Sequence, residues 1–207
     1  MPPWLRAFRA AFTFLTRIPV GGFPYPQKTW AWISIWFPLV GAVLGTLQAL
    51  IWLGLDGHSD PTRAIIVVGF GVLITGGFHE DGLSDSADAL GGAYDRENVL
   101  RILKDSRIGA FGALALILAL ALKISLLVDL GALAPVGLVF GQALSRVVPV
   151  VQLGLQSYTR RDDPTSKSRD VARAGRPQAL IAAVWGLALL GALYWLGIAL
   201  PVIGGVL

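Results

Sequence analysis

The sequence has no cysteine, and charged residues make up only 14% of its 207 residues. The lack of cysteine excludes disulfide bonds, thiolate metal ligands and a cysteine nucleophile, and it does not indicate a compartment. Hydrophobic residues make up 55% of the chain and the mean hydropathy is +0.66, so an ordinary soluble domain is excluded and we expect lipid around much of the protein. No basic stripe interleaved with aromatic residues is present, which argues against binding to nucleic acid.

Long apolar runs stand in place of the missing charges. A helix needs about 20 apolar residues to cross the hydrocarbon core of a bilayer, and five stretches approach that length. The fold class that we expect is therefore all-α, a polytopic integral membrane helix bundle that forms a single domain over residues 1–207. The expected spans are 30–53, 64–78, 108–128, 132–155 and 179–200.

The basic residues outside these spans are distributed unevenly. Fourteen of them precede the first span, lie between the second and third, or lie between the fourth and fifth, while the opposite side has only Arg63. Lys and Arg accumulate in cytoplasmic loops of membrane proteins. The distribution therefore predicts that the N-terminus and both long polar loops face the cytoplasm.

The N-terminal segment Trp4–Arg17 differs from the spans. Leu5, Phe8, Phe12 and Leu15 recur at helical spacing, and arginines interrupt the segment. A cleaved signal peptide has an uninterrupted apolar core, so we expect no targeting segment here. The pattern instead predicts an amphipathic helix that lies in the membrane interface.

Three aspartates follow directly after the second span. Asp81, Asp85 and Asp88 are spaced i, i+4 and i+7, which places their carboxylates on one face of a helix, with Glu80 beside them. Like charges about 4 Å apart repel by roughly 4 kcal/mol at an effective dielectric constant near 20, so this face favours a bound cation. Mg²⁺ or Mn²⁺ shared with substrate phosphates suits such oxygen ligands better than an all-protein calcium site does. The alternative is a solvated acidic turn.

Glycines surround the acidic residues. Gly76 and Gly77 precede them, Gly82 lies among them, and Gly91 and Gly92 follow. Glycine allows tight turns and close approach by another group, and it commonly ends helices. We therefore expect either a tight turn of the backbone or the close approach of a bulky group, and a glycine C-cap at the end of the acidic helix.

A second short helix is predicted after the acidic one. Asp95 is a suitable N-cap residue for a helix over 96–106, which leads to the segment 104–107 at the mouth of the third span. Lys104 and Arg107 are candidates to bind phosphate oxygens, Arg107 by a two-pronged contact, and Asp105 is a candidate to complete the metal site. The alternative for both basic residues is contact with lipid head groups.

Three further charged or titratable residues could have either a functional or a structural role. His79 directly precedes the acids, and it is either a general base or a hydrogen-bonded structural group. Lys123 and Arg146 fall inside spans, where charge usually faces a bundle interior or a watery cavity. Arg146 is either a phosphate ligand or a structural group.

Two motifs are long enough to indicate a family. Residues 75–92 read Thr-Gly-Gly-Phe-His-Glu-Asp-Gly-Leu-Ser-Asp-Ser-Ala-Asp-Ala-Leu-Gly-Gly, and residues 104–112 read Lys-Asp-Ser-Arg-Ile-Gly-Ala-Phe-Gly. The sequences Phe-Leu-Thr-Arg-Ile-Pro at 14–19, Pro-Leu-Val-Gly at 38–41 and Ser-Arg at 145–146 add to them. Over roughly residues 12–150 the sequence resembles the cobalamin synthase (adenosylcobinamide-GDP ribazoletransferase) family.

The resemblance implies a reaction. Members are Mg²⁺-dependent transferases that join adenosylcobinamide-GDP to α-ribazole or its 5′-phosphate and release GMP, a late step of cobalamin biosynthesis. Members usually continue with a Gly-rich segment that contains Thr-Gly-Asp and with a final apolar span, neither of which this sequence contains. The expected partners are these two substrates and the lipid bilayer, and the sequence leaves open whether the protein forms a homo-oligomer.

The candidate site residues follow from the acids, the basic segment and the family's motifs together. For catalysis they are Asp81, Asp85, Asp88, Asp105 and His79; for substrate binding Lys104, Arg107, Arg146 and Gly82; and for Mg²⁺ Glu80, Asp81, Asp85, Asp88 and Asp105.

Clustered aspartates also occur in two other classes of membrane protein. A phospholipid synthase of the CDP-alcohol phosphotransferase kind also uses several aspartates at the membrane boundary, but its Asp-x-x-Asp-Gly-x-x-Ala-Arg run is absent. A cation or proton transporter would use Lys123, Arg146 and the acids as a path. Against a transporter, the acids are clustered in a loop and no paired broken helices indicate inverted repeats.

Overall fold

The computed structural model describes residues 2–105, 107–156, 171 and 174–198. Within these ranges the regular secondary structure is helical and no strand occurs, which confirms the expected all-α class. The chain divides into two compact units, one made of Met1–Asp56 and Ala132–Leu207 and the other of Gly57–Gly131.

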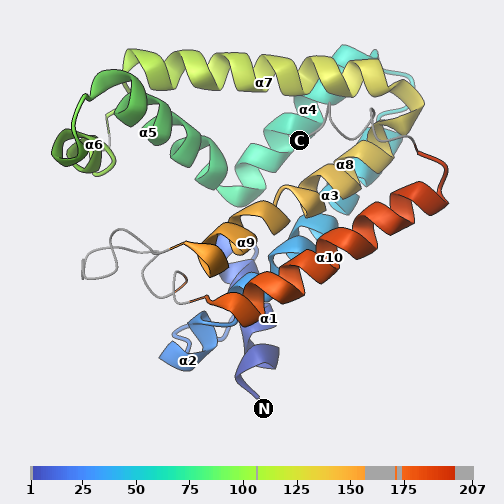
Figure 1. Ribbon diagram of the computed structural model, residues 1–207. Coiled ribbons are helices and arrows are strands. Elements are labelled where there is room, and N and C mark those ends of the chain that lie inside the picture. Colours follow the sequence, from blue (N-terminus) through green and yellow to red (C-terminus); the bar gives the residue numbers. More distant parts are fainter. Residues whose placement is uncertain (1, 106, 157–170, 172–173, 199–207) are drawn as a thin grey trace. The chain divides into compact units, whose positions relative to one another are not determined.

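The first unit is built around two helix pairs. Helices α3 and α8 run side by side, and α9 packs along α10 (Figure 1). The elements of this unit are α1 (Pro3–Leu15), α2 (Gln27–Trp30), the 3₁₀ helix η1 (Ile33–Trp36), α3 (Phe37–Gly54), α8 (Ala134–Leu144), α9 (Val147–Leu155) and α10 (Arg176–Trp195). The short 3₁₀ helix η2 (Gly131–Leu133) stands where the chain passes from one unit to the other.

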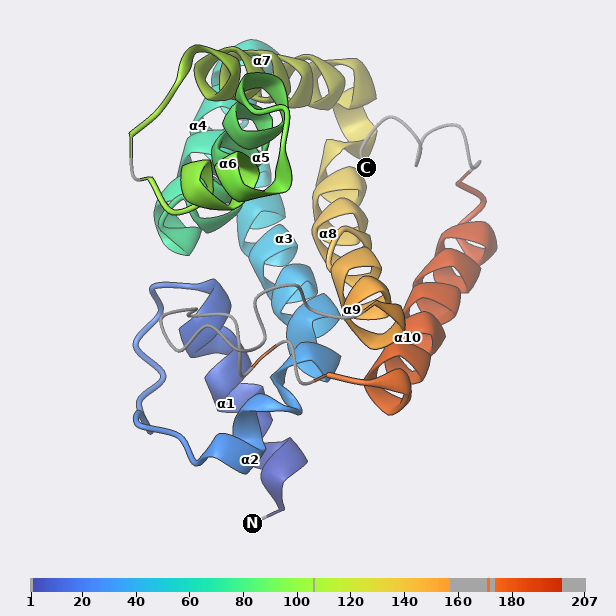
Figure 2. The same cartoon turned by 60° about the vertical axis from the view of Figure 1, so that its left-hand side comes forward.

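The second unit contains the acidic helix. Its elements are α4 (Asp60–Thr75), α5 (Phe78–Gly92), α6 (Arg96–Ile102) and α7 (Ala110–Leu130). Helix α7 packs against both α4 and α5, and the short α6 lies beside α5 (Figure 2).

Proline marks the beginning of many of these helices. It occupies the first or second helical position of α1, α3, α4, α8 and α10. The first backbone N–H groups of a helix have no intrahelical acceptor, so a residue that lacks this N–H costs nothing there, and its fixed φ already suits a helix. These prolines therefore define where the apolar stretches become helical.

Glycines allow the close approach of α3 and α8. A Cβ atom on Gly41 would overlap the backbone carbonyl of Gln142, and one on Gly45 would overlap that of Leu138. Small residues at such positions let membrane helices pack backbone to backbone. The buried Gln48 then accepts a hydrogen bond from Nε2 of Gln142 at 2.8 Å, which links the two helices through polar groups.

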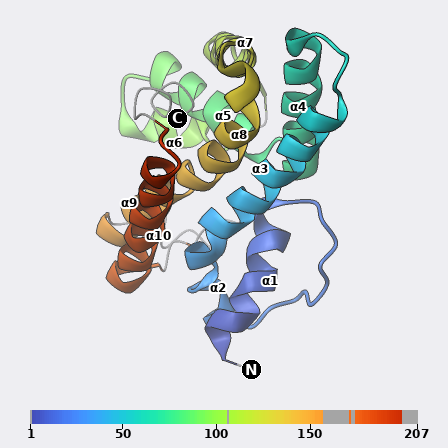
Figure 3. The same cartoon turned by 90° about the vertical axis from the view of Figure 1, so that its right-hand side faces the viewer.

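The N-terminal helix α1 lies against η1, α2 and α3 of its unit (Figure 3). Phe12 and Leu15, which were predicted to face the membrane interface, are buried inside the unit together with a row of alanines. Leu5 and Phe8 are partly exposed, so only this end of the predicted apolar face is available to lipid. The end nearer the N-terminus is also tied down, because Nε1 of Trp36 donates to the carbonyl of Trp4 at 2.7 Å.

Three stretches are long and apolar enough to cross a membrane, judged by length and composition among the described residues: Ile33–Gly54, Ala110–Leu155 and Arg176–Trp195. The second of these has 46 residues and covers the predicted span 132–155 and all but the first two residues of the predicted span 108–128. A fourth candidate arises only if the bent pair α4 and α5 counts as one span. The protein is therefore a membrane protein by the character of its helices, as predicted.

The predicted span 64–78 corresponds to α4, with shifted ends. Helix α4 begins at Asp60, where Arg63 pairs with the Asp60 carboxylate at 3.0 Å, and it ends at Thr75. Helix α4 thus begins four residues before the predicted span, and Pro61 and this ion pair support its polar first turn. Gly76 then ends the helix in the left-handed conformation, with φ of 71°.

The predicted span 132–155 is interrupted. Helix α8 ends at Leu144 and α9 begins at Val147, with Ser145 and Arg146 between them. Pro149 explains the break, because it has no N–H to donate to the carbonyl of Ser145 and its ring would clash with that carbonyl in a continuous helix. The predicted span 179–200 corresponds to α10, and residues 199–200 lie outside the described part of the chain.

Candidate functional site

The acidic helix α5 is separated from α4 by a sharp turn. Gly76 and Gly77 both adopt left-handed conformations, with φ of 71° and 70°, and the axes of α4 and α5 differ by 88°. Residues with a Cβ atom rarely adopt such conformations, so this pair of glycines is required by the turn. The expectation of a tight turn ahead of the acids is confirmed.

The carboxylates of α5 lie close to one another, as their spacing predicted. Asp85 stands between Asp81 and Asp88, and the charges of both act on it. Asp81 is exposed and Asp85 is half-buried. Glu80 lies beside them in the first turn, and its Oε2 is buried without a hydrogen-bond partner. A buried carboxylate oxygen without a partner is costly, and a cation is one way to satisfy it.

The carboxylates suit a metal that is shared with a substrate. Among the residues that the structure describes, no three His, Asp or Glu side chains converge as a complete metal site. Mg²⁺ does not need such a group, because it usually binds through one or two carboxylates and completes its shell with phosphate oxygens and water. Together with the unsatisfied oxygen of Glu80, this donor set fits Mg²⁺ and does not fit an all-protein calcium cage.

Asp88 is engaged differently from its neighbours. Its Oδ2 accepts a hydrogen bond from the backbone N–H of Gly109 at 2.7 Å, and its Oδ1 accepts one from the N–H of Gly112 at 2.8 Å. These N–H groups belong to the beginning of α7, whose positive end favours an anionic partner. Both oxygens of this predicted metal ligand are thus used in joining two helices.

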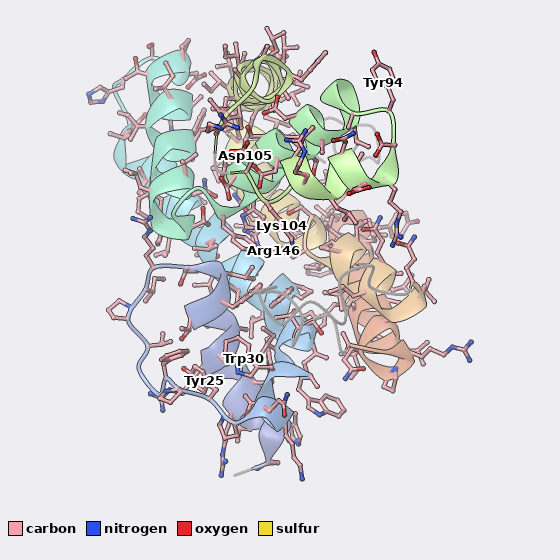
Figure 4. All side chains as sticks on the ribbon, turned by 90° about the vertical axis from the view of Figure 1, so that its left-hand side faces the viewer. Tyr25, Trp30, Tyr94, Lys104, Asp105 and Arg146 are labelled. Carbon is pink, nitrogen blue, oxygen red and sulfur yellow. The ribbon has the colours of Figure 1, made fainter. Side chains whose placement is uncertain are left out.

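Asp105 and Arg107 form an ion pair on the segment after α6, where Figure 4 labels Asp105 and Lys104. The Arg107 guanidinium donates through Nε and Nη2, the latter at 2.6 Å from Oδ2, and its backbone N–H donates to Oδ1 at 3.1 Å. The side-chain hydrogen bond first and the backbone hydrogen bond second lower the pKa of Asp105 to about 2. The side-chain hydrogen bond to Asp105, followed by the negative charge of Asp105, raises the pKa of Arg107.

Helix α6 is shorter than predicted, but it begins where expected. Asp95 accepts a hydrogen bond from the backbone N–H of Asn98 at 2.9 Å, which confirms it as the N-cap residue and lowers its pKa. The helix ends at Ile102, and the next residues continue as turns, with the N–H of Lys104 on the carbonyl of Arg101 at 3.1 Å. Ser106, the predicted end, lies outside the described residues.

The remaining candidates are spread over both units. His79 is exposed, and its ring lies edge-on to that of Phe78, with the two ring centroids 5.4 Å apart. Gly82 is exposed with open space beside it, so it leaves room for a ligand without requiring one. Arg146 belongs to the first unit, where it is buried and donates from Nη1 to Oε1 and to the backbone carbonyl of Gln142, each at 2.6 Å.

Several important contacts were not foreseen. Helix α5 ends at Gly92 without a left-handed residue, so the expected glycine C-cap was wrong. Gly91 instead receives the Phe111 ring, whose Cγ would lie 2.6 Å from an added Cβ. The buried Ser84 lies at the same contact, opposite Gly112. The Gly-Ala-Phe-Gly run at 109–112 was the available signal, since two glycines three residues apart at a helix start permit close approach.

The two units of this membrane protein thus differ in character. In the first, aromatic side chains gather around α1 and α2, such as Tyr25 and Trp30, whose ring centroids are 6.0 Å apart (Figure 4). In the second, carboxylates of α5 lie on the same unit as the basic segment at Lys104 and Arg107. The second unit of this helical membrane protein therefore holds both the acidic and the basic candidate residues.

The chain belongs to the cobalamin-5-phosphate synthase family, because the sequence model of that family matches residues 7–207. This confirms the family that the two motifs indicated, and it places the protein among those of cobalamin synthesis. No solved structure matches the chain.

Curated relatives carry the name adenosylcobinamide-GDP ribazoletransferase. The protein from Shewanella frigidimarina is 42% identical over 186 residues, which cover 82% of this chain and 68% of the relative. The protein from Shewanella amazonensis is 43% identical over 178 residues, covering 82% and 67%, and that from Shewanella sp. strain W3-18-1 is 39% identical over 181 residues, covering 80% and 65%. The chain thus spans about two thirds of the length of the curated relatives that it matches.

Proposed function

We propose that the protein is an adenosylcobinamide-GDP ribazoletransferase that joins adenosylcobinamide-GDP to α-ribazole or its 5′-phosphate and releases GMP. The observation that carries this proposal is the carboxylate face of α5, with the unsatisfied oxygen of Glu80 beside Asp81 and Asp85, in a chain of this family. The positive-inside distribution of Lys and Arg supports an orientation with the acidic helix on the cytoplasmic side, and the membrane proposed for a protein of this family is the inner membrane of a prokaryote.

Mg²⁺ is part of the proposal. Glu80, Asp81 and Asp85 are the residues of α5 that would hold it, and Asp105 is a further candidate. When bound, Mg²⁺ would neutralise charge on the pyrophosphate of the substrate and so make it more open to attack. The fit rests on the oxygen donors themselves and on the buried Glu80 oxygen, which has no protein partner.

The protein's own residues supply charge and alignment. Attack of a hydroxyl group on a pyrophosphate requires little covalent chemistry from an enzyme, so positioning and electrostatic stabilisation account for most of the catalysis. Arg107 is exposed and already presents its fork to the two oxygens of Asp105. A phosphate group offers the same pair of oxygens with more charge, so Arg107 can exchange the carboxylate for a substrate phosphate and stabilise the departing GMP. Lys104, also exposed, supplies a second positive charge on this segment.

A reconstituted assay tests the proposal. The protein is purified in detergent and incubated with adenosylcobinamide-GDP, α-ribazole and Mg²⁺, and the cobalamin product and GMP are separated by chromatography. Wild type should form both products in equal amounts, and Asp85→Asn should form neither at a measurable rate. Glu97→Gln is the matched control, because Glu97 is an exposed carboxylate on α6 that is not part of the α5 cluster.

The assay also needs a positive control. One of the longer ribazoletransferases from Shewanella, run beside this protein, establishes that the substrates and detergent are adequate. Product from the longer relative and none from this chain would refute the proposed activity.

A further inference from the structure

A pair of hydrogen bonds ties α5 to the beginning of α7. Gly109 is the N-cap residue of α7 and Gly112 is its third helical residue, and their N–H groups donate to the two oxygens of Asp88 at 2.7 and 2.8 Å. An N-cap side chain normally accepts such bonds from its own helix. Gly109 has no side chain that could accept these bonds, so Asp88, 21 residues away in the sequence, acts as the capping acceptor.

Gly109 and Gly112 make this arrangement possible, because neither position has space for a Cβ atom. A Cβ atom on Gly109 would overlap Oδ1 of Asp88, and one on Gly112 would overlap Oδ2 of Asp88 and Oγ of Ser84. At Gly91 the crowding comes from α7, because the Phe111 ring of α7 packs against this glycine of α5. We name this set of interactions the α5–α7 contact.

The α5–α7 contact positions the C-terminal end of the basic segment 104–107. Gly109 follows Arg107 by two residues, so the bond to Asp88 fixes the end of the segment 104–107 relative to α5. Asp85 and Asp81 lie on the same helix as Asp88, about one and two turns earlier, respectively. The Asp88 carboxylate therefore fixes the position of Arg107 relative to Asp81 and Asp85.

We propose that Asp88 is a positioning residue, which anchors the start of α7 to α5 and thereby holds Arg107 in place relative to Asp81 and Asp85, and that it is not a metal ligand. The kinetic part of this inference rests on the proposed function. The anchor itself does not, because its hydrogen bonds are present without substrate or metal.

The first test measures thermal unfolding in detergent, without Mg²⁺ or substrate. Asp88→Asn keeps the shape of the side chain but replaces one acceptor with a donor, and Gly112→Ala forces the carboxylate away. Both should lower the unfolding midpoint by on the order of 5 °C. Asp85→Asn should not lower it, because it removes repulsion from Asp81 and Asp88. Gly69→Ala, on α4 with open space around it, is the control and should not lower it either.

The second test separates an anchor from a ligand and from a purely structural residue. Rates are measured per folded protein against Mg²⁺ and against adenosylcobinamide-GDP. Asp88→Asn should raise the KM for adenosylcobinamide-GDP on the order of tenfold, because Arg107 is displaced, and should leave the half-saturating Mg²⁺ concentration within about twofold of wild type. Loss of folding alone would change neither constant.

Three results would overturn the inference. Unchanged midpoints for both Asp88→Asn and Gly112→Ala would mean that there is no anchor. A raised Mg²⁺ requirement in Asp88→Asn, with activity restored by more Mg²⁺, would make Asp88 a ligand. A lowered midpoint with an unchanged KM would make it structural only. Failure of the proposed function would instead appear as no product from any variant, wild type included, and the thermal comparison would still support or overturn the anchor.

Discussion

Arg107 holds Asp105 in a two-pronged ion pair, with Nη2 2.6 Å from Oδ2 and Nε 3.0 Å from Oδ1. From the sequence, the two residues were predicted to bind different parts of the substrate complex, phosphate and metal. Under the proposed function, each group would occupy the binding atoms of the other until substrate arrives. The arginine is largely exposed, so the exchange for a phosphate does not require burial of a new charge.

Arg107→Ala should reduce kcat/KM by about a hundredfold, which corresponds to about 3 kcal/mol for one lost charged contact to the transition state. Arg107→Lys keeps the charge but loses the fork, so it should recover only part of this loss. Added Mg²⁺ should not rescue Arg107→Ala, whereas it should partly rescue Asp105→Asn. A titration of rate against Mg²⁺ for the three variants measures this, and rescue of Arg107→Ala but not of Asp105→Asn would show that the roles are reversed.

The Asp105–Arg107 pair should persist in acid. Because the pKa of Asp105 is lowered to about 2 from the usual 3.8, the stabilisation that the pair supplies is complete above pH 3.8 and is lost as the pH falls through about 2. Arg107→Ala should raise the Asp105 pKa toward 3.8, as followed by carbon NMR of labelled aspartate in micelles. Asp95, whose low pKa comes first from the backbone N–H of Asn98, is the control and should not move. An unchanged Asp105 pKa in Arg107→Ala would contradict this origin.

Helix type and the acidic face were predictable because they depend on local patterns. The i, i+4, i+7 spacing placed Asp81, Asp85 and Asp88 on one helix, and the Gly76–Gly77 pair marked the turn before it. The use of Asp88 was not predictable, because its partners are the backbone N–H groups of a helix that starts more than twenty residues later. Every residue except proline has a backbone N–H group, so residue types do not show which of these groups binds a distant side chain.

The break between α8 and α9 is an intermediate case. Pro149 was visible in the predicted span 132–155, and its missing N–H is sufficient reason for the interruption at Ser145 and Arg146. What the sequence did not reveal is the bonding of Arg146, which depends on Gln142 one turn earlier and on the approach of α3. Hydropathy counts apolar residues and does not register such polar contacts.

Gln142 should be important for the stability of the first unit. It donates to Gln48 on α3 and accepts from Arg146, so Gln142→Leu leaves polar groups on both neighbours without this partner. We expect a loss of about 2 kcal/mol in unfolding free energy. Gln48→Leu combined with Gln142→Leu should cost less than the sum of the two single changes, because the pair is removed together.

Unfolding in detergent measures these effects. Gln152→Leu on α9 is the control, since Gln152 is exposed, and it should leave the unfolding free energy within about 0.5 kcal/mol of wild type. A Gln142→Leu variant as stable as this control would show that the link between α3 and α8 contributes nothing.

The chain lacks cysteine, so its topology can be tested by single introduced cysteines. Tyr94→Cys, at the exposed turn between α5 and α6, should react with an impermeant reagent only after the cells are opened. His58→Cys, in the loop predicted to face outward, should react in intact cells. Lys167→Cys tests the second polar loop, which lies outside the described residues. Labelling of Tyr94→Cys or Lys167→Cys in intact cells would contradict the predicted orientation.

If the carboxylates of α5 bind the Mg²⁺ that the transfer requires, the dependence of rate on Mg²⁺ concentration in Asp85→Asn tests this binding most directly. We expect this variant to insert into the membrane normally and to show no Mg²⁺-dependent formation of the cobalamin product, while Glu97→Gln keeps the wild-type dependence. Near-normal activity of Asp85→Asn at limiting Mg²⁺ would show that these carboxylates do not bind the required metal.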